Sequence, residues 1–299
     1  MIVFWLSAIA LIITTWNVIS MRVVGLKGAK FVSDSVDILI PMRNEQTNAE
    51  GSLKSLLNSE LLENSEIYAL DDCSIDETAN LIKTFNVNFI SGSDIPKGWL
   101  GKTWACHCLA KAGSGEYLAF IDADVRLHPY AISSAISTMQ GLSWDYISPY
   151  PKQLAGTFLE KLIQPLLQWS WIASVPLRLA EKFPNRAMTI ANGQFFIVKR
   201  SAYEAIGGHQ SISGEILEDL ELARLLTSKG FKGGLAEASS VASCRMYESS
   251  QELIDGYTKS LWRAFGGSMG TIVAIFLLLA TGIAPYLSIG APSLFIFLS

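Results

Sequence analysis

Charged residues are missing from both ends of this chain, although the whole sequence has an ordinary number of them. Residues 1–21 and 264–299 contain no Lys, Arg, Asp or Glu, and all 23 basic and 27 acidic residues lie between Arg22 and Arg263. The charge density of that middle part is typical of a globular domain. The pattern excludes a disordered chain, a fibrous repeat and a polytopic carrier.

Cysteine, histidine and net positive charge are also scarce. The chain has 4 Cys and 3 His, and its formal net charge is −4. These values argue against a disulfide-stapled miniprotein and against a nucleic-acid partner. Cys106, His107 and Cys108 would suggest zinc only with a second Cys/His pair at ligand spacing, and the sequence has none.

The charge-free N-terminus predicts a membrane anchor. Residues 1–21 would form a helix about 30 Å long, which is the thickness of the hydrocarbon core of a bilayer. Arg22, Lys27 and Lys30 follow this run, whereas the basic residues of a cleaved signal peptide precede it. We therefore expect a transmembrane helix over residues 1–21 and a following domain on the cytoplasmic face of the cell membrane.

The apolar C-terminus predicts further membrane segments. As one helix, residues 264–299 would be about 54 Å long, too long for one crossing and short for two. We expect an amphipathic interfacial helix over residues 251–265 and membrane segments over 266–299, with one span near residues 269–287. A buried apolar helix is the alternative. Residues 154–183 likewise fit either the membrane surface or the core.

The middle of the chain alternates between strand and helix patterns. Strands are predicted at residues 36–41, 67–72, 87–91 and 117–122, and helices at 53–61, 75–85 and 102–112. Repeated βα units of this size predict an α/β domain over residues 35–250, with a mostly parallel sheet and helices on both faces. Ligands of such sheets bind beyond the carboxyl ends of the strands.

Polar residues follow three of these strands directly. The clusters are Arg43 to Glu45, Asp71 with Asp72, and Asp122 with Asp124. Asp122 and Asp124 are two residues apart, so their side chains point to the same face of an extended chain. Such a pair suits Mg²⁺ or Mn²⁺ completed by phosphate oxygens, although strand-end turns produce the same triplet.

Two further acidic groups have both a functional and a structural interpretation. Asp72 could accept a hydrogen bond from a uracil imide or a ribose hydroxyl, whereas Asp76 fits a helix cap. Glu218 and Asp219 open a predicted helix, where acidic residues are favoured by the helix dipole. The carboxylates around this helix start are more than a cap needs. One of these two residues is therefore a candidate general base, which the amides at the helix start would keep ionised.

The ordered motifs PMRNE, DDCSIDET, GWLGKTWA, IDADV, ILEDLEL and CRMYES resemble those of family-2 glycosyltransferases of the GT-A fold. More narrowly, the chain is similar to the membrane-bound branch that includes bacterial carotenoid-acid (diaponeurosporenoate-type) and hopanoid-associated enzymes. This resemblance implies inverting, metal-dependent transfer of a sugar from a nucleotide-sugar donor, UDP-linked by analogy, to a lipophilic acceptor. The bilayer would then be a partner.

The resemblance also implies residue roles. Asp219, supported by Glu218, is the expected catalytic base, and Asp124 with Asp122 is expected to hold Mg²⁺ or Mn²⁺. Lys102 opens a helix whose amides would face the donor diphosphate. The expected donor-binding residues are Pro41, Arg43, Glu45, Asp71, Asp72, Lys102 and Asp122. The candidates for the acceptor or membrane side are Trp169, Trp171, Trp262 and Arg263, for which core packing is the alternative.

The sequence departs from the polysaccharide synthases of this superfamily. Where they carry Q-x-x-R-W, this chain reads Lys259-Ser-Leu-Trp262-Arg263, which weakens a polymer-synthase interpretation. Transfer to a polyprenyl phosphate, glycolipid or polysaccharide remains an alternative activity. A nucleotidyltransferase would show a Gly- and Arg-rich loop after the first strand, which PMRNE is not. A non-catalytic membrane scaffold that retains the fold is the alternative of another class.

Overall fold

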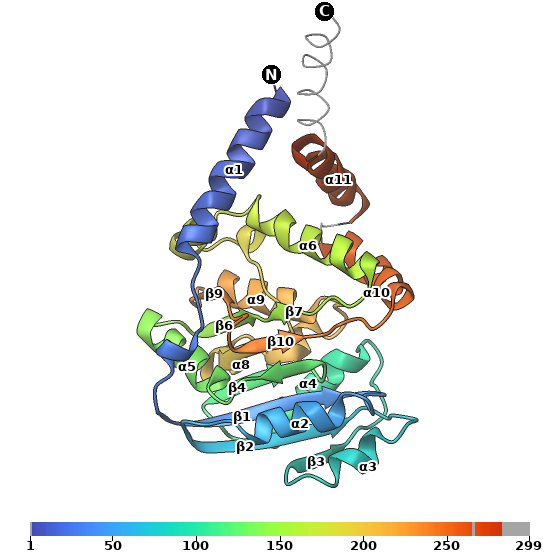
Figure 1. The fold of residues 1–299 in the computed structure, drawn as a ribbon. Helices are drawn as coiled ribbons and strands as arrows, with labels where there is room; N and C mark the ends of the chain where they lie inside the picture. The colour runs from blue at the N-terminus through green and yellow to red at the C-terminus, as the bar shows by residue number, and fades with distance from the viewer. Residues whose placement is uncertain (1, 265–266, 283–299) are drawn as a thin grey trace, which may run out of the picture. The chain divides into compact units, whose positions relative to one another are not determined.

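A computed structural model of the chain describes residues 2–264 and 267–282 and divides it into two units. The helical unit consists of Met1–Met21, Ala155–Arg178 and Tyr247–Ser299, and the sheet unit consists of Arg22–Leu154 and Leu179–Met246. Figure 1 labels the elements of both units. Each unit is described by itself below.

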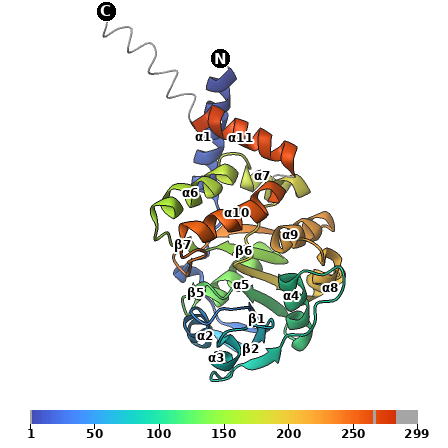
Figure 2. The ribbon, with the colours of Figure 1, turned by 90° about the vertical axis from the view of Figure 1, so that its right-hand side faces the viewer.

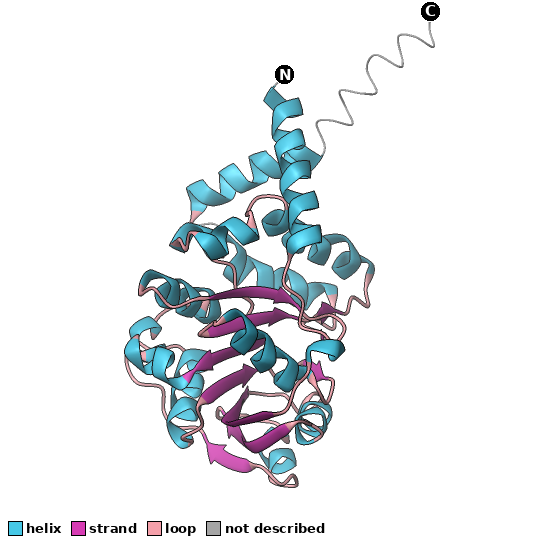
Figure 3. Cartoon of the chain, turned by 90° about the vertical axis from the view of Figure 1, so that its left-hand side faces the viewer, coloured by secondary structure: helices cyan, strands magenta, loops and turns pink. Residues whose placement is uncertain are grey.

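The sheet unit is built on one seven-stranded sheet, shown in magenta in Figure 3. Its strand order is β3-β2-β1-β4-β8-β6-β9. β8 is antiparallel to β4 and β6, and the other neighbours are parallel, so the predicted mostly parallel sheet is confirmed. The strands are β1 (Val32–Met42), β2 (Leu62–Asp71), β3 (Asn88–Ser91), β4 (Tyr117–Ile121), β6 (Tyr146–Tyr150), β8 (Phe195–Lys199) and β9 (Gly233–Glu237).

A second, three-stranded sheet lies in the same unit. Its order is β5-β10-β7, with β10 (Ala242–Cys244) antiparallel to β5 (Val125–Leu127) and parallel to β7 (Lys152–Gln153). β5 begins directly after the Asp122 to Asp124 motif. The short sheet therefore brings Cys244 opposite Val125, next to that motif.

Helices cover both faces of the main sheet, because its central strands are apolar on both sides. In β1, Ile38 and Ile40 pack into one core and Leu39 packs into the other. The first core takes α2 (Ala49–Leu57), α3 (Thr78–Ile82) and α5 (Ala131–Leu142). The second takes α4 (Gly101–Ala112), α8 (Arg200–Ala205), the 3₁₀ helix η3 (Gly208–Ile212) and α9 (Glu218–Ser228), as Figure 2 shows.

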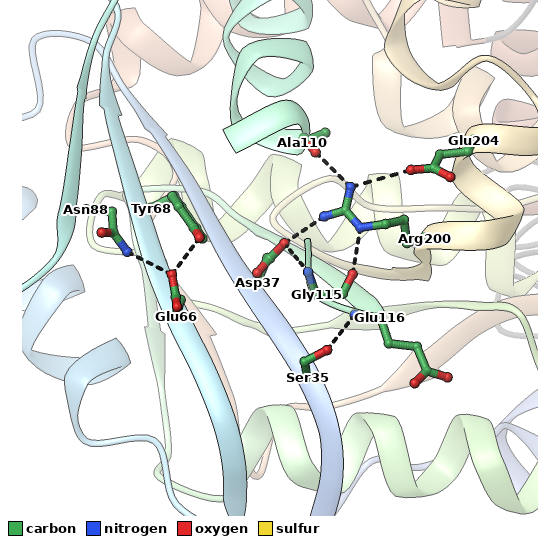
Figure 4. Close-up of polar contacts among 10 residues, drawn as sticks. All are labelled: Ser35, Asp37, Glu66, Tyr68, Asn88, Ala110, Gly115, Glu116, Arg200 and Glu204. Carbon is green, nitrogen blue, oxygen red and sulfur yellow. Dashed lines mark hydrogen bonds and ion pairs between the residues drawn. The ribbon is translucent and has the colours of Figure 1, made fainter. Parts of the chain in front are cut away.

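A buried ion pair joins β1 to the start of α8, as Figure 4 shows. The Asp37 carboxylate accepts hydrogen bonds from the Arg200 guanidinium at 2.6 Å and from the Gly115 N–H at 2.8 Å. Arg200 also donates to the carbonyls of Gly115 and Ala110. A Cβ on Gly115 would lie 2.7 Å from the Asp37 carboxylate, so glycine is required where the chain passes from α4 to β4.

The helical unit contains α1 (Ile2–Ser20), α6 (Phe158–Ile172), α10 (Ser250–Ala264) and α11 (Ser268–Gly282). α1 contacts α6 and α11, and α10 contacts both of these helices. The fully buried Asn17 donates to the carbonyls of Ile172 and Val175 and accepts from the Leu177 N–H. One polar side chain of α1 thus satisfies the backbone between α6 and α7 (Leu177–Lys182).

The predicted transmembrane helices are wrong for the part of the chain that the structure describes, where no helix is both long and apolar enough to cross a membrane. α11 has 15 residues, which is about 22 Å against a hydrocarbon core of about 30 Å. The last turns of α1 carry Thr14, Thr15, Asn17 and Ser20, and Asn17 is occupied by hydrogen bonds to protein. Residues 283–299, part of the predicted C-terminal segments, lie outside the described residues.

α10 covers almost the whole range in which the interfacial helix was expected. Its place at a membrane interface stays a prediction.

Candidate active site

The carboxyl ends of β1 and β2 place Arg43, Asp71 and Asp72 at one edge of the sheet. Nη1 of Arg43 lies 3.3 Å from Oδ2 of Asp72; the Arg43 side chain is 55% exposed, whereas that of Asp72 is buried. Oδ1 of Asp71 is buried without a hydrogen-bond partner among the described residues. This edge therefore offers an exposed cation and two buried acceptors, which suits the base and ribose role predicted for it.

The loops that follow β1 and β2 fix each other. The Asn44 N–H donates to the Ser74 hydroxyl at 2.9 Å, and the Glu45 N–H donates to the Thr78 hydroxyl at 2.8 Å. Thr78 in turn donates its N–H to the Asp76 carboxylate, although the N-cap residue of α3 is Glu77 and not Asp76. The edge that carries Arg43 is consequently pre-organised.

Glu45 lies on the inner side of these loops. Burial raises the pKa of its carboxyl group, and the charge of Asp124 raises it further, against a hydrogen bond from Asn48. The charge of Asp124 is thus felt at the first loop.

The start of α4 connects the two halves of the site. A Cβ on Gly101 would lie 3.1 Å from Oδ2 of Asp72, and the next residue, Lys102, points to the other acidic cluster. Nζ of Lys102 lies 2.9 Å from the Asp122 carboxylate and 2.8 Å from that of Glu218. Burial opposes its charge, but these two carboxylates outweigh it and hold the pKa of Lys102 well above its usual range.

Asp122 follows β4 and is held close to Asp124. Burial raises the pKa of Asp122 to about 7; Lys102 opposes this rise, while the negative charges of Asp124 and Glu218 add to it. Such a carboxyl group would ionise fully once a cation approached it. This electrostatic environment is the one that the metal hypothesis requires.

The two oxygens of the Asp124 carboxylate have different surroundings. Its Oδ1 is buried and has no hydrogen-bond partner among the described residues, while the Cys244 thiol donates a hydrogen bond to the carboxylate. Within the described ranges no group of three His, Cys, Asp or Glu residues is arranged to hold a metal ion. The residues fit Mg²⁺ or Mn²⁺ bound through one or two carboxylates and completed by substrate phosphates.

Glu218 and Asp219 begin α9 and have different partners. Glu218 is paired with Lys102, whereas Asp219 packs against Gly193, where a Cβ would lie 2.9 Å from that of Asp219. Burial and the charge of Glu218 raise the pKa of Asp219 to about 6, against the hydrogen bonds from the backbone of Leu220 and Gly193. Burial thus makes Asp219 a stronger base than an ordinary aspartate; its role as the catalytic base stays a prediction.

One pocket collects several of the predicted residues. Pro41, Lys102, Asp122, Glu218 and Asp219 line it together with Cys106, Phe120, Gly193, Phe196, His209 and Leu222. The six additional residues were not predicted from the sequence. In the sequence, the glycine pair directly before His209 was a signal of an unusual backbone. In the structure, Gly207 and Gly208 both have a positive φ.

The acceptor-side candidates lie in the helical unit. Trp169 and Trp171 are on α6, where Trp171 is buried and Trp169 is half-buried. Trp262 and Arg263 belong to α10, and their side chains lie outside the described part of the structure. Contact of these residues with an acceptor stays a prediction.

Comparison with known proteins shows the family of the chain. The family model of glycosyl transferase family 2 matches residues 37–207. The chain is 27% identical over 302 residues to 4,4'-diaponeurosporenoate glycosyltransferase of Staphylococcus aureus (strain USA300), covering 95% of this chain and 78% of that protein. The same identity is found to the enzyme of strain COL.

Solved structures show the same fold. The mannosyltransferase PcManGT from Pyrobaculum calidifontis, in complex with GDP-Man and Mn²⁺, aligns with a TM-score of 0.57 at 14% identity, over 98% of this chain and 92% of that one. S. aureus TarS aligns with a TM-score of 0.52 at 13% identity, over 74% of this chain and 38% of that one.

The fold is an α/β sheet with an acidic site at its carboxyl edge. The chain belongs to glycosyl transferase family 2, and it is a glycosyltransferase enzyme. The resemblance read from its motifs is thereby confirmed.

Proposed function

We propose that the protein transfers a sugar, with inversion and with a divalent cation, from a UDP-sugar to a lipophilic acceptor such as a carotenoid acid. The single observation that carries the proposal is the junction at Lys102. This ammonium group bridges Asp122 and Glu218, and the next residue after Glu218 is the base candidate. Leaving-group and acceptor chemistry are thus adjacent in one pocket.

Arg43, Asp71 and Asp72 would bind the nucleotide. Asp71 keeps a buried oxygen without a partner among the described residues, and a buried acceptor of this kind gains most from a ligand that donates to it. A ribose hydroxyl or a base N–H is such a donor. TarS has been solved with UDP-GlcNAc and PcManGT with GDP-Man, which supports a nucleotide-sugar donor for this family member.

The transfer itself is a single displacement. The acceptor oxygen forms a bond to the anomeric carbon while the bond from that carbon to the diphosphate oxygen breaks, and the electron pair leaves with the nucleoside diphosphate. Asp219 takes the proton of an acceptor hydroxyl. If the acceptor is a carboxylate, no proton is transferred and Asp219 only orients it. Lys102 donates to the departing diphosphate, whose growing negative charge it offsets.

Asp124 and Asp122 would hold the cation. A bound Mg²⁺ or Mn²⁺ supplies electrostatic stabilisation of the leaving diphosphate. The chain contributes the neighbouring Asp122 carboxylate and the buried Oδ1 of Asp124, which has no hydrogen-bond partner within the described ranges.

The helical unit supports a lipophilic acceptor. Large apolar side chains of its helices are exposed, including Phe4, Ile12, Phe158 and Met269, and contiguous exposed apolar surface marks sites for apolar partners. The named relative acts on a carotenoid acid according to its name. We place the protein at the cytoplasmic face of the cell membrane, where Arg22, Lys27 and Lys30 would meet anionic lipid.

The test uses the purified full chain, a carotenoid acid and a panel of labelled UDP-sugars with Mg²⁺. We expect one labelled, lipid-extractable product, loss of activity with EDTA, and an inverted anomer by NMR. Asp124→Asn should prevent Mg²⁺ from restoring activity, whereas Asp34→Asn, at the opposite end of β1, is the matched control. A retained anomer would refute the single displacement, and labelled polyprenyl phosphate or polysaccharide would redirect the acceptor assignment.

A further inference from the structure

One buried side chain in the active-site pocket has no part in the mechanism above. His209 is 2% exposed and lines the pocket with Lys102, Glu218 and Asp219. Burial lowers the pKa of His209 to about 3, and the positive charges of His107 and Lys102 lower it further. The imidazole is therefore neutral at any pH at which the enzyme works.

Its hydrogen bonds fix which ring nitrogen carries the proton. Nδ1 of His209 lies 2.7 Å from the hydroxyl oxygen of Tyr203, and the backbone N–H of His209 donates to the same oxygen at 3.1 Å. Burial raises the pKa of Tyr203 far above its usual range, so its hydroxyl keeps its proton. Because the hydroxyl already accepts from the backbone N–H, we assign its proton to the hydrogen bond with Nδ1, which places the hydrogen of the neutral ring on Nε2.

The ring is held in place from several sides. Phe120 meets it edge-on with 5.0 Å between ring centroids. Gly207 and Gly208 have positive φ angles of 78° and 53°, and a Cβ on Gly208 would lie 2.4 Å from the Tyr203 ring. These two glycines let the chain turn tightly enough to bring the imidazole against the Tyr203 hydroxyl.

Nε2 of His209 has no hydrogen-bond partner among the described residues. Because the ring lines the pocket, this nitrogen is open to a ligand. The neighbouring carboxylates disfavour a further anion beside His209, whereas a sugar hydroxyl can accept from Nε2–H and donate to a carboxylate at the same time. A hydroxyl group is the ligand that fits both neighbours.

We propose that His209 binds a hydroxyl group of the donor's sugar ring through Nε2–H and so helps to select the sugar that is transferred. This inference rests on the proposed function, because it assigns a sugar subsite within that donor pocket. Tyr203 is a positioning residue in this arrangement: it touches no substrate and acts by holding the tautomer and orientation of His209.

The first test separates the sugar from the nucleotide by calorimetry on the full chain with Mg²⁺. UDP-glucose, UDP-galactose, UDP-N-acetylglucosamine and GDP-mannose are titrated, and the tightest binder is kept with its free nucleotide. His209→Phe should weaken the sugar nucleotide by about three- to tenfold, the range of one neutral hydrogen bond, and leave the free nucleotide unchanged. His128→Phe, an exposed histidine, should change neither.

The second test identifies the hydroxyl. Donors that lack one sugar hydroxyl each are compared on the wild type and on His209→Phe. One deoxy donor should bind the wild type more weakly than its parent and bind the variant as well as its parent does. A penalty that persists for every deoxy donor in the variant would overturn the contact.

The tautomer gives a readout that does not depend on binding. The chain has 3 His, so two-bond ¹H–¹⁵N NMR spectra can be assigned with His107 and His128 variants. We expect Nε2–H for His209 in the wild type and a mixture of tautomers in Tyr203→Phe, with a smaller affinity loss than His209→Phe. An Nδ1–H tautomer in the wild type would overturn the proposal even if His209→Phe failed to fold.

The outcomes distinguish the two proposals. If no sugar nucleotide binds or is consumed, the proposed function fails and the subsite falls with it. If a sugar nucleotide is transferred but His209→Phe binds it as tightly as the wild type, only the sugar subsite is wrong.

Discussion

The two halves of the active site hold their charges differently. Around β1 and β2, Arg43 is largely exposed and makes one ion pair of 3.3 Å with Asp72. Around α4 and α9, Lys102 lies between two carboxylates, and the pKa values of Asp122 and Asp219 are raised to about 7 and about 6. The first half is suited to recognising a ligand by hydrogen bonds. The second half holds carboxyl groups with strongly shifted pKa values, which is typical of catalytic sites.

The largest expected effect is at the base. Asp219→Asn removes the proton acceptor while keeping the contact with Gly193, so kcat with a hydroxyl acceptor should fall by about 10² to 10⁴-fold. Initial rates at saturating donor measure it. Glu215→Gln, in the exposed loop just before α9, is the matched control. If kcat of Asp219→Asn falls by less than threefold, Asp219 is not the base, and Glu218 becomes the candidate.

Lys102→Met should have the next largest effect. It removes the cation between Asp122 and Glu218, so kcat/KM for the donor should fall by about 100-fold. Lys111→Met, in the last turn of the same helix, should leave kcat/KM unchanged. Equal effects of the two substitutions would show that the Lys102 junction is not part of the site.

The pH dependence sharpens the comparison because the second half contains Asp122 and Asp219, whose pKa values are raised to about 7 and about 6. Asp219 must be ionised to accept a proton, so log kcat/KM should fall by about one unit per pH unit below about pH 6. The pH profile of kcat/KM with a hydroxyl acceptor measures it. A profile that stays flat down to pH 4.5 contradicts Asp219 as the base.

The same shift has a consequence for stability. The folded-state pKa of Asp219 is raised from an ordinary value of 3.8 to about 6, so ionised Asp219 destabilises the fold above about pH 6, and this cost disappears as the pH falls. Asp219→Asn should therefore raise the Tm at pH 8 and leave it unchanged near pH 4. Thermal unfolding at both pH values tests the sign, and a lower Tm at pH 8 would contradict it.

The smallest effect is expected in the recognition half. Arg43→Ala removes one exposed ion pair, which is worth at most about 1 kcal/mol, and one ligand contact. KM for the donor should rise by about three- to tenfold with kcat unchanged. Steady-state kinetics measure it. If Arg43→Ala lowers kcat as much as Lys102→Met does, the two halves do not differ in function.

The strand ends could be predicted because parallel strands place their carboxyl ends together whatever their order. Asp71, Asp72 and Asp122 were found in this way. β8, an antiparallel strand that begins next to Asp122, was not predicted, and it brings Gly193 beside Asp219. For the described residues the membrane-spanning helices were wrong, because composition alone did not show that Asn17 is bonded within the protein.

The amino-acid sequence by itself determined the alternation of strands and helices, the acidic strand ends and the family, because these follow from local periodicity and from short ordered motifs. Only the tertiary structure decided which charges meet. The bridge from Lys102 to Glu218 joins residues more than a hundred positions apart, and the pKa values of Asp122 and Asp219 depend on burial. The orientation of His209 likewise depends on Tyr203 and two glycines. Long-range packing sets burial and distance, and these fix the strength of each electrostatic interaction.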